Sequence, residues 1–211
     1  MSLCGIAARC PGLTAGHGPD HDAPALVGYV FEPEVLHEIA CRNIGPPMEE
    51  LLPNLVADLA ERYPDHINTD LDWVFNNAGG AMGAMTFLHG SITEYLIVFG
   101  TPIGTEGHTG RFFADDYFII LEGEQWSYTP GDLKRSVYGP GEMHHLPGGI
   151  ARGYRIPEHC WALEYARGLI PSMLPFGFAD AMSSTLDWRT VARTLSIYGR
   201  ATVRQLARGK V

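Results

Sequence analysis

Three acidic residues interrupt two apolar runs of this 211-residue chain, where a buried strand normally carries no charge. Asp115 and Asp116 lie in the run 114–121, and Glu164 lies in the run 160–166. An unpaired carboxylate in an apolar site is so costly that the group finds a partner or keeps its proton with a raised pKa. Two such acids suit proton transfer on an apolar substrate, because one gives a proton while the other accepts one. The alternative is that they face water on edge strands.

The spacing of the apolar residues predicts the elements that position these acids. Helical spacing predicts two helices within 33–63. Over 85–166, short apolar runs alternate with Gly- and Pro-rich turns, which is typical of an antiparallel sandwich or small barrel. Residues 71–75 are predicted to form a helical turn, after which Gly79 and Gly80 allow close packing. The predicted strands are 85–89, 94–99, 114–121, 124–128, 134–138, 143–146, 151–156 and 160–165.

The C-terminal residues 169–207 return to a helical pattern. The segment from Trp188 onward holds six of the fifteen basic residues and no acidic residue, while the whole chain has a net charge of −9. An apolar stripe beside an arginine stripe favours an in-plane helix at a membrane surface. Nucleic acid is not an expected partner, because the acidic body would repel phosphate. The alternative is a helix packed on its own domain. Residues 1–25 are predicted to be a flexible leader before a single domain at 26–211.

Metal binding is a second candidate chemistry. His144 and His145 follow a Gly-rich turn, as ligands do in metal-binding cupin barrels, and His108 is alone in another Gly-rich turn. A metal site would require a third and a fourth ligand to converge on them. The sequence contains no nucleophile elbow, phosphate-binding loop or dinucleotide fingerprint. We therefore predict no metal and no cofactor, with a metal-dependent cupin enzyme as an alternative.

Seven short motifs, at 73–80, 84–85, 94–95, 99–101, 107–111, 114–118 and 163–171, are spread over most of the chain. Together they resemble the motifs of the fungal sterol delta-8 to delta-7 isomerases and of their relative, the sigma non-opioid receptor. The resemblance extends from about residue 29 to residue 206. The motifs at 114–118, 144–146, 173–178 and 183–187 are similar to those of the enzymes and differ from the receptor.

The resemblance implies a mainly β fold, a cupin-like β-barrel with N-terminal helices and two C-terminal membrane-facing helices. It implies a buried hydrophobic cavity, a homotrimer and a membrane-associated protein, in the endoplasmic reticulum if the host is eukaryotic. Relatives usually carry an N-terminal transmembrane helix where this chain has a Gly-rich leader. The C-terminal helices are therefore expected to hold the protein at the membrane.

The implied activity is migration of a sterol double bond from delta-8 to delta-7, in ergosterol-type sterol biosynthesis. Asp116 and Glu164 are expected to face one another across the barrel and to share one proton. Asp115, on the other face of its strand, is kept as a third candidate catalytic residue. The alternative is a non-catalytic, receptor-like binder of amphiphilic amines or sterols, with the acid pair as counter-ion. The predicted substrate-binding residues are Met85, Tyr95, Ile97, Phe99, Phe118, His144, Leu146, Tyr154, Ile170, Met173, Leu174 and Tyr198.

Overall fold

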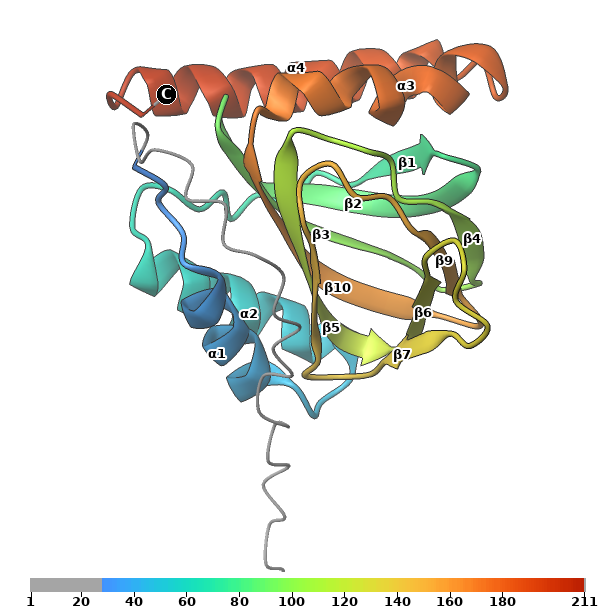
Figure 1. The fold of residues 1–211 in the computed structure, drawn as a ribbon. Helices are drawn as coiled ribbons and strands as arrows, with labels where there is room; N and C mark the ends of the chain where they lie inside the picture. The colour runs from blue at the N-terminus through green and yellow to red at the C-terminus, as the bar shows by residue number, and fades with distance from the viewer. Residues whose placement is uncertain (1–27, 211) are drawn as a thin grey trace, which may run out of the picture.

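A computed structural model describes residues 28–210, in which two β-sheets stand between N-terminal and C-terminal helices (Figure 1). The predicted leader, 1–25, lies outside the described residues. The larger sheet has the order β1-β2-β3-β10-β5-β8 and the smaller has the order β4-β9-β6-β7. The described fold is therefore mainly β with flanking helices, as predicted. The strands are β1 (Val74–Ala78), β2 (Ala81–Gly90), β3 (Glu94–Thr101), β4 (Thr105–His108), β5 (Ala114–Gly123), β6 (Gln125–Tyr128), β7 (Ser136–Tyr138), β8 (Met143–Leu146), β9 (Gly153–Ile156) and β10 (Cys160–Gly168).

The larger sheet begins before residue 85, so the predicted helical turn at 71–75 is wrong. Strand β1 pairs with β2 so that Ala78 lies opposite Ala81. Gly79 and Gly80, with φ of 62° and 85°, form the two-residue loop between them. Positive φ at both loop positions matches the right-handed twist of a hairpin and favours glycine. The Gly-Gly pair was thus a hairpin signal, and β4 is a further strand that the predicted strands did not include.

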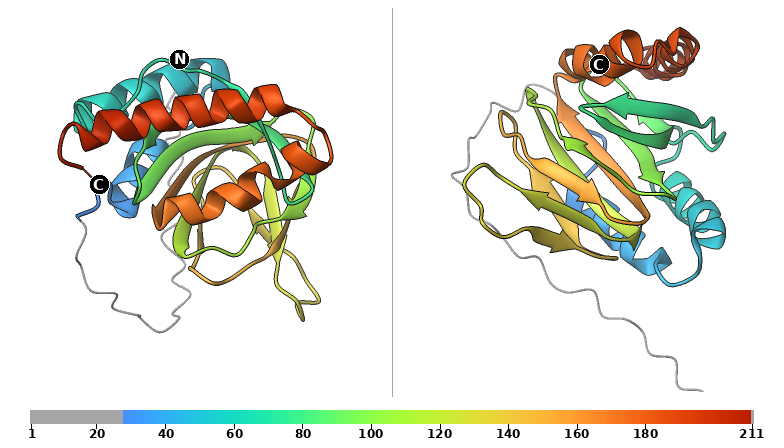
Figure 2. Two further views of the ribbon diagram at one scale, coloured as in Figure 1. Left: turned by 90° about the horizontal axis from the view of Figure 1, so that it is seen from above. Right: turned by 90° about the vertical axis from the view of Figure 1, so that its right-hand side faces the viewer.

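Helices α1 (Pro33–Asn43) and α2 (Met48–Arg62) pack on the outer face of the larger sheet (Figures 1 and 2). Tyr117 and Ile119 of β5 belong to this outer core, whereas Phe118 and Ile120 belong to the core between the sheets. A strand that is buried on both faces has a continuous run of apolar residues in its sequence. Residues 117–121 of β5 are therefore buried on both faces, and β5 lies between β10 and β8, so it is not an edge strand.

The C-terminal helices form a layer over one end of the two sheets (Figures 1 and 2). This layer comprises the 3-10 turn η1 (Ile170–Met173), α3 (Leu174–Ser183) and α4 (Trp188–Leu206). Helix α4 begins after Asp187, whose carboxylate accepts a hydrogen bond of 3.0 Å from the backbone N–H of Thr190. Ile197 and Tyr198 of α4 are buried in the core between the sheets. Within 28–210, no helix combines the length and the apolarity that a bilayer crossing requires.

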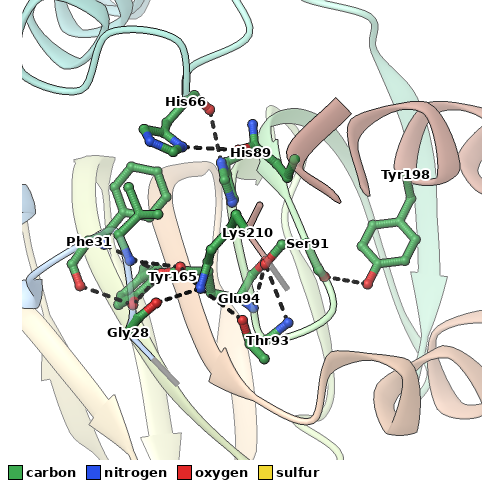
Figure 3. A network of polar contacts seen from close by, with 12 residues as sticks. Gly28, Phe31, His66, His89, Ser91, Thr93, Glu94, Tyr165, Tyr198 and Lys210 are labelled. Carbon is green, nitrogen blue, oxygen red and sulfur yellow. Dashed lines mark hydrogen bonds and ion pairs between the residues drawn. The ribbon is translucent and has the colours of Figure 1, made fainter. Parts of the chain in front are cut away.

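A buried ion pair ties the end of the described chain to the start of β3 (Figure 3). Lys210 Nζ lies 2.9 Å from Glu94 Oε1, and the two side chains are 10% and 0% exposed. Glu94 also accepts hydrogen bonds from the Tyr165 hydroxyl, at 2.9 Å, and from the backbone N–H of Val30, at 2.8 Å. Lys210 donates further hydrogen bonds to the carbonyl of Gly28 and to the hydroxyl of Thr93. The network holds α4 over the sheets and fixes the residue before Tyr95.

Candidate active site

A largely apolar cavity lies between the two sheets, beneath η1, α3 and α4. Asp116 from β5 and Glu164 from β10 line it. All twelve residues predicted to bind substrate also line it, from strands of both sheets and from the C-terminal helices. That these twelve side chains contact a substrate remains a prediction.

The two acids are diagonal neighbours on adjacent strands. Asp116 pairs with Ala166 across the β5–β10 ladder, and Glu164 pairs with Phe118. Diagonal positions of this kind lie roughly 7–8 Å apart. The expectation that the acids face one another across the barrel is therefore wrong. Their proximity on one wall allows both carboxyl groups to reach the same region of a bound substrate.

The surroundings of the two carboxyl groups differ. Glu164 accepts a short hydrogen bond from the hydroxyl of Tyr95 on β3. The Oδ1 atom of Asp116 is buried and has no hydrogen-bond partner among the described residues. Burial, reinforced by the charge of Glu164, raises the pKa of Asp116 well above its ordinary value. Burial also raises the pKa of Glu164 to about 7, although the Tyr95 hydrogen bond opposes the rise.

This asymmetry determines which acid keeps a proton. Two like charges in an apolar cavity cannot both form at low cost, so the pair retains one proton near neutral pH. The Tyr95 hydroxyl stabilises a carboxylate at Glu164, and Asp116 Oδ1 has no comparable donor. Above the Glu164 pKa of about 7, the pair is accordingly a neutral Asp116 beside an ionised Glu164, which provides a proton donor next to a proton acceptor.

The raised pKa of Glu164 predicts a pH-dependent stability. The ordinary pKa is 4.5 and burial raises it to about 7, so between these values the folded state holds a proton that the unfolded state has released. The free energy of unfolding must fall as pH rises through this window. We expect Glu164→Gln to lose less stability than wild type between pH 5 and pH 8. Thermal unfolding at both pH values measures this, and parallel losses in the two proteins would contradict it.

Asp115 lies outside the cavity, which corrects its inclusion among the candidate catalytic residues. Its carboxylate accepts a hydrogen bond of 2.9 Å from the backbone N–H of Gly148 and lies 3.5 Å from His145 Nε2. The His145 contact and the Gly148 bond lower the pKa of Asp115. Successive strand residues point to opposite faces, so only one of two adjacent acids can enter the cavity. Asp115 is an ionised, half-exposed acid that holds the turn before β9.

The three histidines considered as metal ligands lie in different surroundings. His144 lines the cavity, where Arg152 is 2.6 Å from its Nε2, and burial with this nearby charge lowers the pKa of His144 to about 3. His145 stacks on Tyr117 on the opposite face of β8. His108 accepts a hydrogen bond from the backbone N–H of Gly110. Over residues 28–210, no three His, Cys, Asp or Glu side chains gather as a metal site requires.

The model of one protein family, described as ERG2 and Sigma1 receptor like protein, matches residues 22–210. The chain belongs to this family. A C-8 sterol isomerase of Neurospora crassa is 54% identical over 187 residues, which cover 86% of this chain and 73% of that protein. Sigma non-opioid intracellular receptor 1 of Danio rerio is 39% identical over 177 residues, covering 83% of this chain and 80% of the receptor.

A solved structure with partial likeness is an RmlC-like cupin from Shewanella frigidimarina. It has a TM-score of 0.40 and 15% sequence identity, and the match covers 47% of this chain and 85% of that chain. The structural match therefore covers less than half of this chain.

Several cavity residues of this ERG2 and Sigma1 receptor family member were not predicted. Phe176 and Phe178 lie on α3, and the many large apolar residues of this segment are the signal that could have found them. Gln125 begins a short strand, and Thr194 is a polar residue on the buried face of α4. A single polar residue in an element carries no periodic signal, so only the tertiary structure places it. The unpredicted lining residues also include Asn76, Ala78, Ala81, Phe87, His108, Thr109, Phe112 and Gly177.

Proposed function

We propose that this chain is a C-8 sterol isomerase, which moves a sterol ring double bond from delta-8 to delta-7. The observation that carries the proposal is the pair Asp116 and Glu164, two buried carboxyl groups on one wall of an apolar cavity. The family membership and the name of the Neurospora crassa relative support the same activity. The reaction belongs to sterol biosynthesis, of the ergosterol type in fungi.

The proposed reaction is an acid–base cycle that requires no cofactor. The protonated Asp116 donates its proton to carbon 9 of the delta-8 alkene, leaving a tertiary carbocation at carbon 8. The Glu164 carboxylate removes a proton from carbon 7, whose electron pair forms the delta-7 bond. Asp116 is then ionised and Glu164 neutral, and transfer of one proton between them restores the resting pair. The negative charge on Asp116 stabilises the cation strongly because the carboxyl group is buried in a largely apolar cavity.

Aromatic rings around the acids support a cationic intermediate. Phe118 pairs with Glu164 and is two residues along β5 from Asp116, and its ring centroid is 6.1 Å from that of Phe99. Both rings line the cavity, as does Tyr95. A ring face attracts a cation within about 6 Å, and more strongly where water is excluded. These side chains would therefore lower the energy of the carbocation without taking part in proton transfer.

The proposal is tested in a yeast strain that lacks its own C-8 sterol isomerase. Expression of the wild-type chain should convert the accumulated delta-8 sterols to delta-7 sterols, as measured by mass spectrometry of extracted lipids. If the protein is abundant and delta-8 sterols persist, the isomerase is rejected. The receptor-like binder of amphiphilic amines then becomes the better proposal, because a pocket that stabilises a carbocation also attracts an ammonium ion.

We also propose that the chain binds a membrane surface through α3 and α4. Helix α4 packs one face on the sheets and leaves Trp188, Leu195 and Val203 at least 45% exposed, beside exposed arginines. An exposed apolar stripe flanked by basic residues suits the boundary between lipid headgroups and acyl chains. In a eukaryotic host, the membrane would be that of the endoplasmic reticulum.

Membrane binding predicts a measurable effect of the exposed apolar groups. Trp188→Ser combined with Leu195→Ser is expected to lower co-flotation with anionic lipid vesicles by about tenfold, since apolar burial at the interface is lost. Leu133→Ser is the matched control, because Leu133 is a fully exposed apolar residue between β6 and β7. Equal flotation of all three proteins would count against the α4 surface.

The family resemblance supports two further proposals, on the closure of the fold and on its assembly. We propose that the two sheets form a cupin-like barrel and that three copies of the chain assemble as a homotrimer. Light scattering of the detergent-solubilised protein, after size-exclusion chromatography, measures the mass of the assembly. A mass near that of one chain would reject the trimer and leave the proposed reaction unaffected.

A further inference from the structure

Three polar residues at the cavity have no role in the proposed proton transfer. Gln125 of β6 and His144 of β8 line the cavity and are 4% and 5% exposed. Arg152, before β9, lies behind His144. Polar side chains are rarely kept this deep without hydrogen-bond partners, because desolvation would go uncompensated. Their arrangement indicates which kind of ligand group they suit.

The hydrogen bonds in this cluster have a defined direction. Arg152 lies 2.6 Å from Nε2 of His144, and a guanidinium group can only donate, so Nε2 accepts. The imidazole proton must then be on Nδ1, which is 3.4 Å from Oε1 of Gln125. The amide oxygen of Gln125 is occupied by His144. Its NH₂ group, for which no hydrogen bond to a residue from 28 to 210 is found, remains for the cavity that Gln125 lines.

The cluster therefore presents a hydrogen-bond donor with a positive charge behind it. Such a group binds an uncharged oxygen acceptor and repels an ammonium group. Because the pKa of His144 is lowered to about 3, the imidazole stays neutral and the direction of the chain is kept over the working pH range. The Gln125 end of the cavity therefore donates hydrogen bonds and repels cations, whereas the acid pair carries negative charge and attracts cations.

His144, the member of the cluster that lies on the larger sheet, is two strands away from Glu164. His144 pairs with Phe118, and Phe118 pairs with Glu164, so two strand spacings, about 10 Å, separate the backbones of His144 and Glu164. In a sterol, the 3-hydroxyl group is attached to ring A, next to the ring that carries the delta-8 bond. The cavity wall formed by η1 and α3 is apolar, including Met173 and Phe176, and suits the alkyl side chain.

We propose that the Gln125 amide donates a hydrogen bond to the 3-hydroxyl oxygen of the sterol and so positions the ring alkene on Asp116 and Glu164. This inference rests on the proposed isomerase function. It makes Gln125 a residue that sets substrate specificity, with His144 and Arg152 as positioning residues that fix the orientation of its amide.

The test compares two delta-8 sterols, one with a 3-hydroxyl group and one 3-deoxy, in the same detergent micelles. Equilibrium binding and isomerisation are both measured on the full chain. Wild type is expected to bind the 3-hydroxy sterol about 3- to 10-fold more tightly, the range of one neutral hydrogen bond. Gln125→Leu and Gln125→Asn should reduce this preference to about onefold, because leucine cannot donate and asparagine is one methylene too short.

A control variant, together with separate measurements of binding and of isomerisation, distinguishes failure of this inference from failure of the proposed function. Thr194→Val removes another buried polar group of the same cavity, on α4, and should keep the wild-type preference. Gln125→Asn retains a polar side chain, so it is the variant to rely on if Gln125→Leu fails to fold. No preference in wild type, or an undiminished preference in Gln125→Asn, overturns the inference even where isomerisation proceeds. A preference that depends on Gln125 without any isomerisation would instead reject the proposed function.

Discussion

Glu164→Gln lowers the rate of sterol isomerisation by about 10²- to 10⁴-fold, the usual contribution of a positioned general base. The amide has nearly the shape of the carboxyl group and can still accept the Tyr95 hydrogen bond, but it cannot take the proton from carbon 7. The substitution also removes the charge that helps to keep Asp116 protonated. The measurement is the initial rate of delta-7 sterol formation by the purified variant, after thermal unfolding has shown that it is folded.

Asp116→Asn should lower the rate of sterol isomerisation by a similar factor, because the amide has no acidic proton to donate to the alkene. Since the two acids act as one unit, the double variant is expected to be only slightly worse than either single variant. Asp115→Asn is the matched control: it changes the adjacent acid, which lies outside the cavity, and should keep wild-type turnover. Full activity in Glu164→Gln, or strong loss in Asp115→Asn, would contradict the assignment.

The sequence revealed the acids because a carboxyl group within a continuous apolar run is unusual. Strand parity alone separates Asp115 from Asp116, and the structure shows which of them enters the cavity. The sequence could not show that Asp116 and Glu164 are diagonal neighbours. That relation depends on pairing β5 with β10, two strands separated by some forty residues, and distant strand register is set by tertiary packing.

Two further features were hidden for different physical reasons. The segment 71–75 was predicted to form a helical turn, although the Gly79-Gly80 pair that follows fits a hairpin loop, because the five-residue strand β1 is too short for a clear period of two. Gln125 gave no signal, since its role depends on hydrogen bonds to His144 and, through it, to Arg152, which lie on other elements. Apolar periodicity predicts which faces are buried, whereas polar partnerships require the assembled fold.

Disrupting the ion pair between Glu94 and Lys210 is expected to destabilise the protein more than any other single change at an ion pair. Every group that reaches the Glu94 carboxylate is a donor, including the Tyr165 hydroxyl and the backbone N–H of Val30 (Figure 3). The NH₂ group of Glu94→Gln would face one of these donors. Removing one member of a buried pair costs about 3–5 kcal/mol, and we expect Glu94→Gln to fall in this range.

Lys210→Met should cost less, about 1–3 kcal/mol, because the Glu94 carboxylate retains its other donors, the Tyr165 hydroxyl and the backbone N–H of Val30. Urea unfolding of both variants and of the double variant gives the coupling energy. Arg200→Met is the matched control on α4, since Arg200 lies 3.9 Å from Asp72 in an exposed pair, and such pairs contribute roughly 0–1 kcal/mol. Because Lys210 holds α4, which places Tyr198 over the cavity, Lys210→Met should also speed amide exchange in α4. Unchanged exchange together with unchanged stability would show that the ion pair does not anchor this helix.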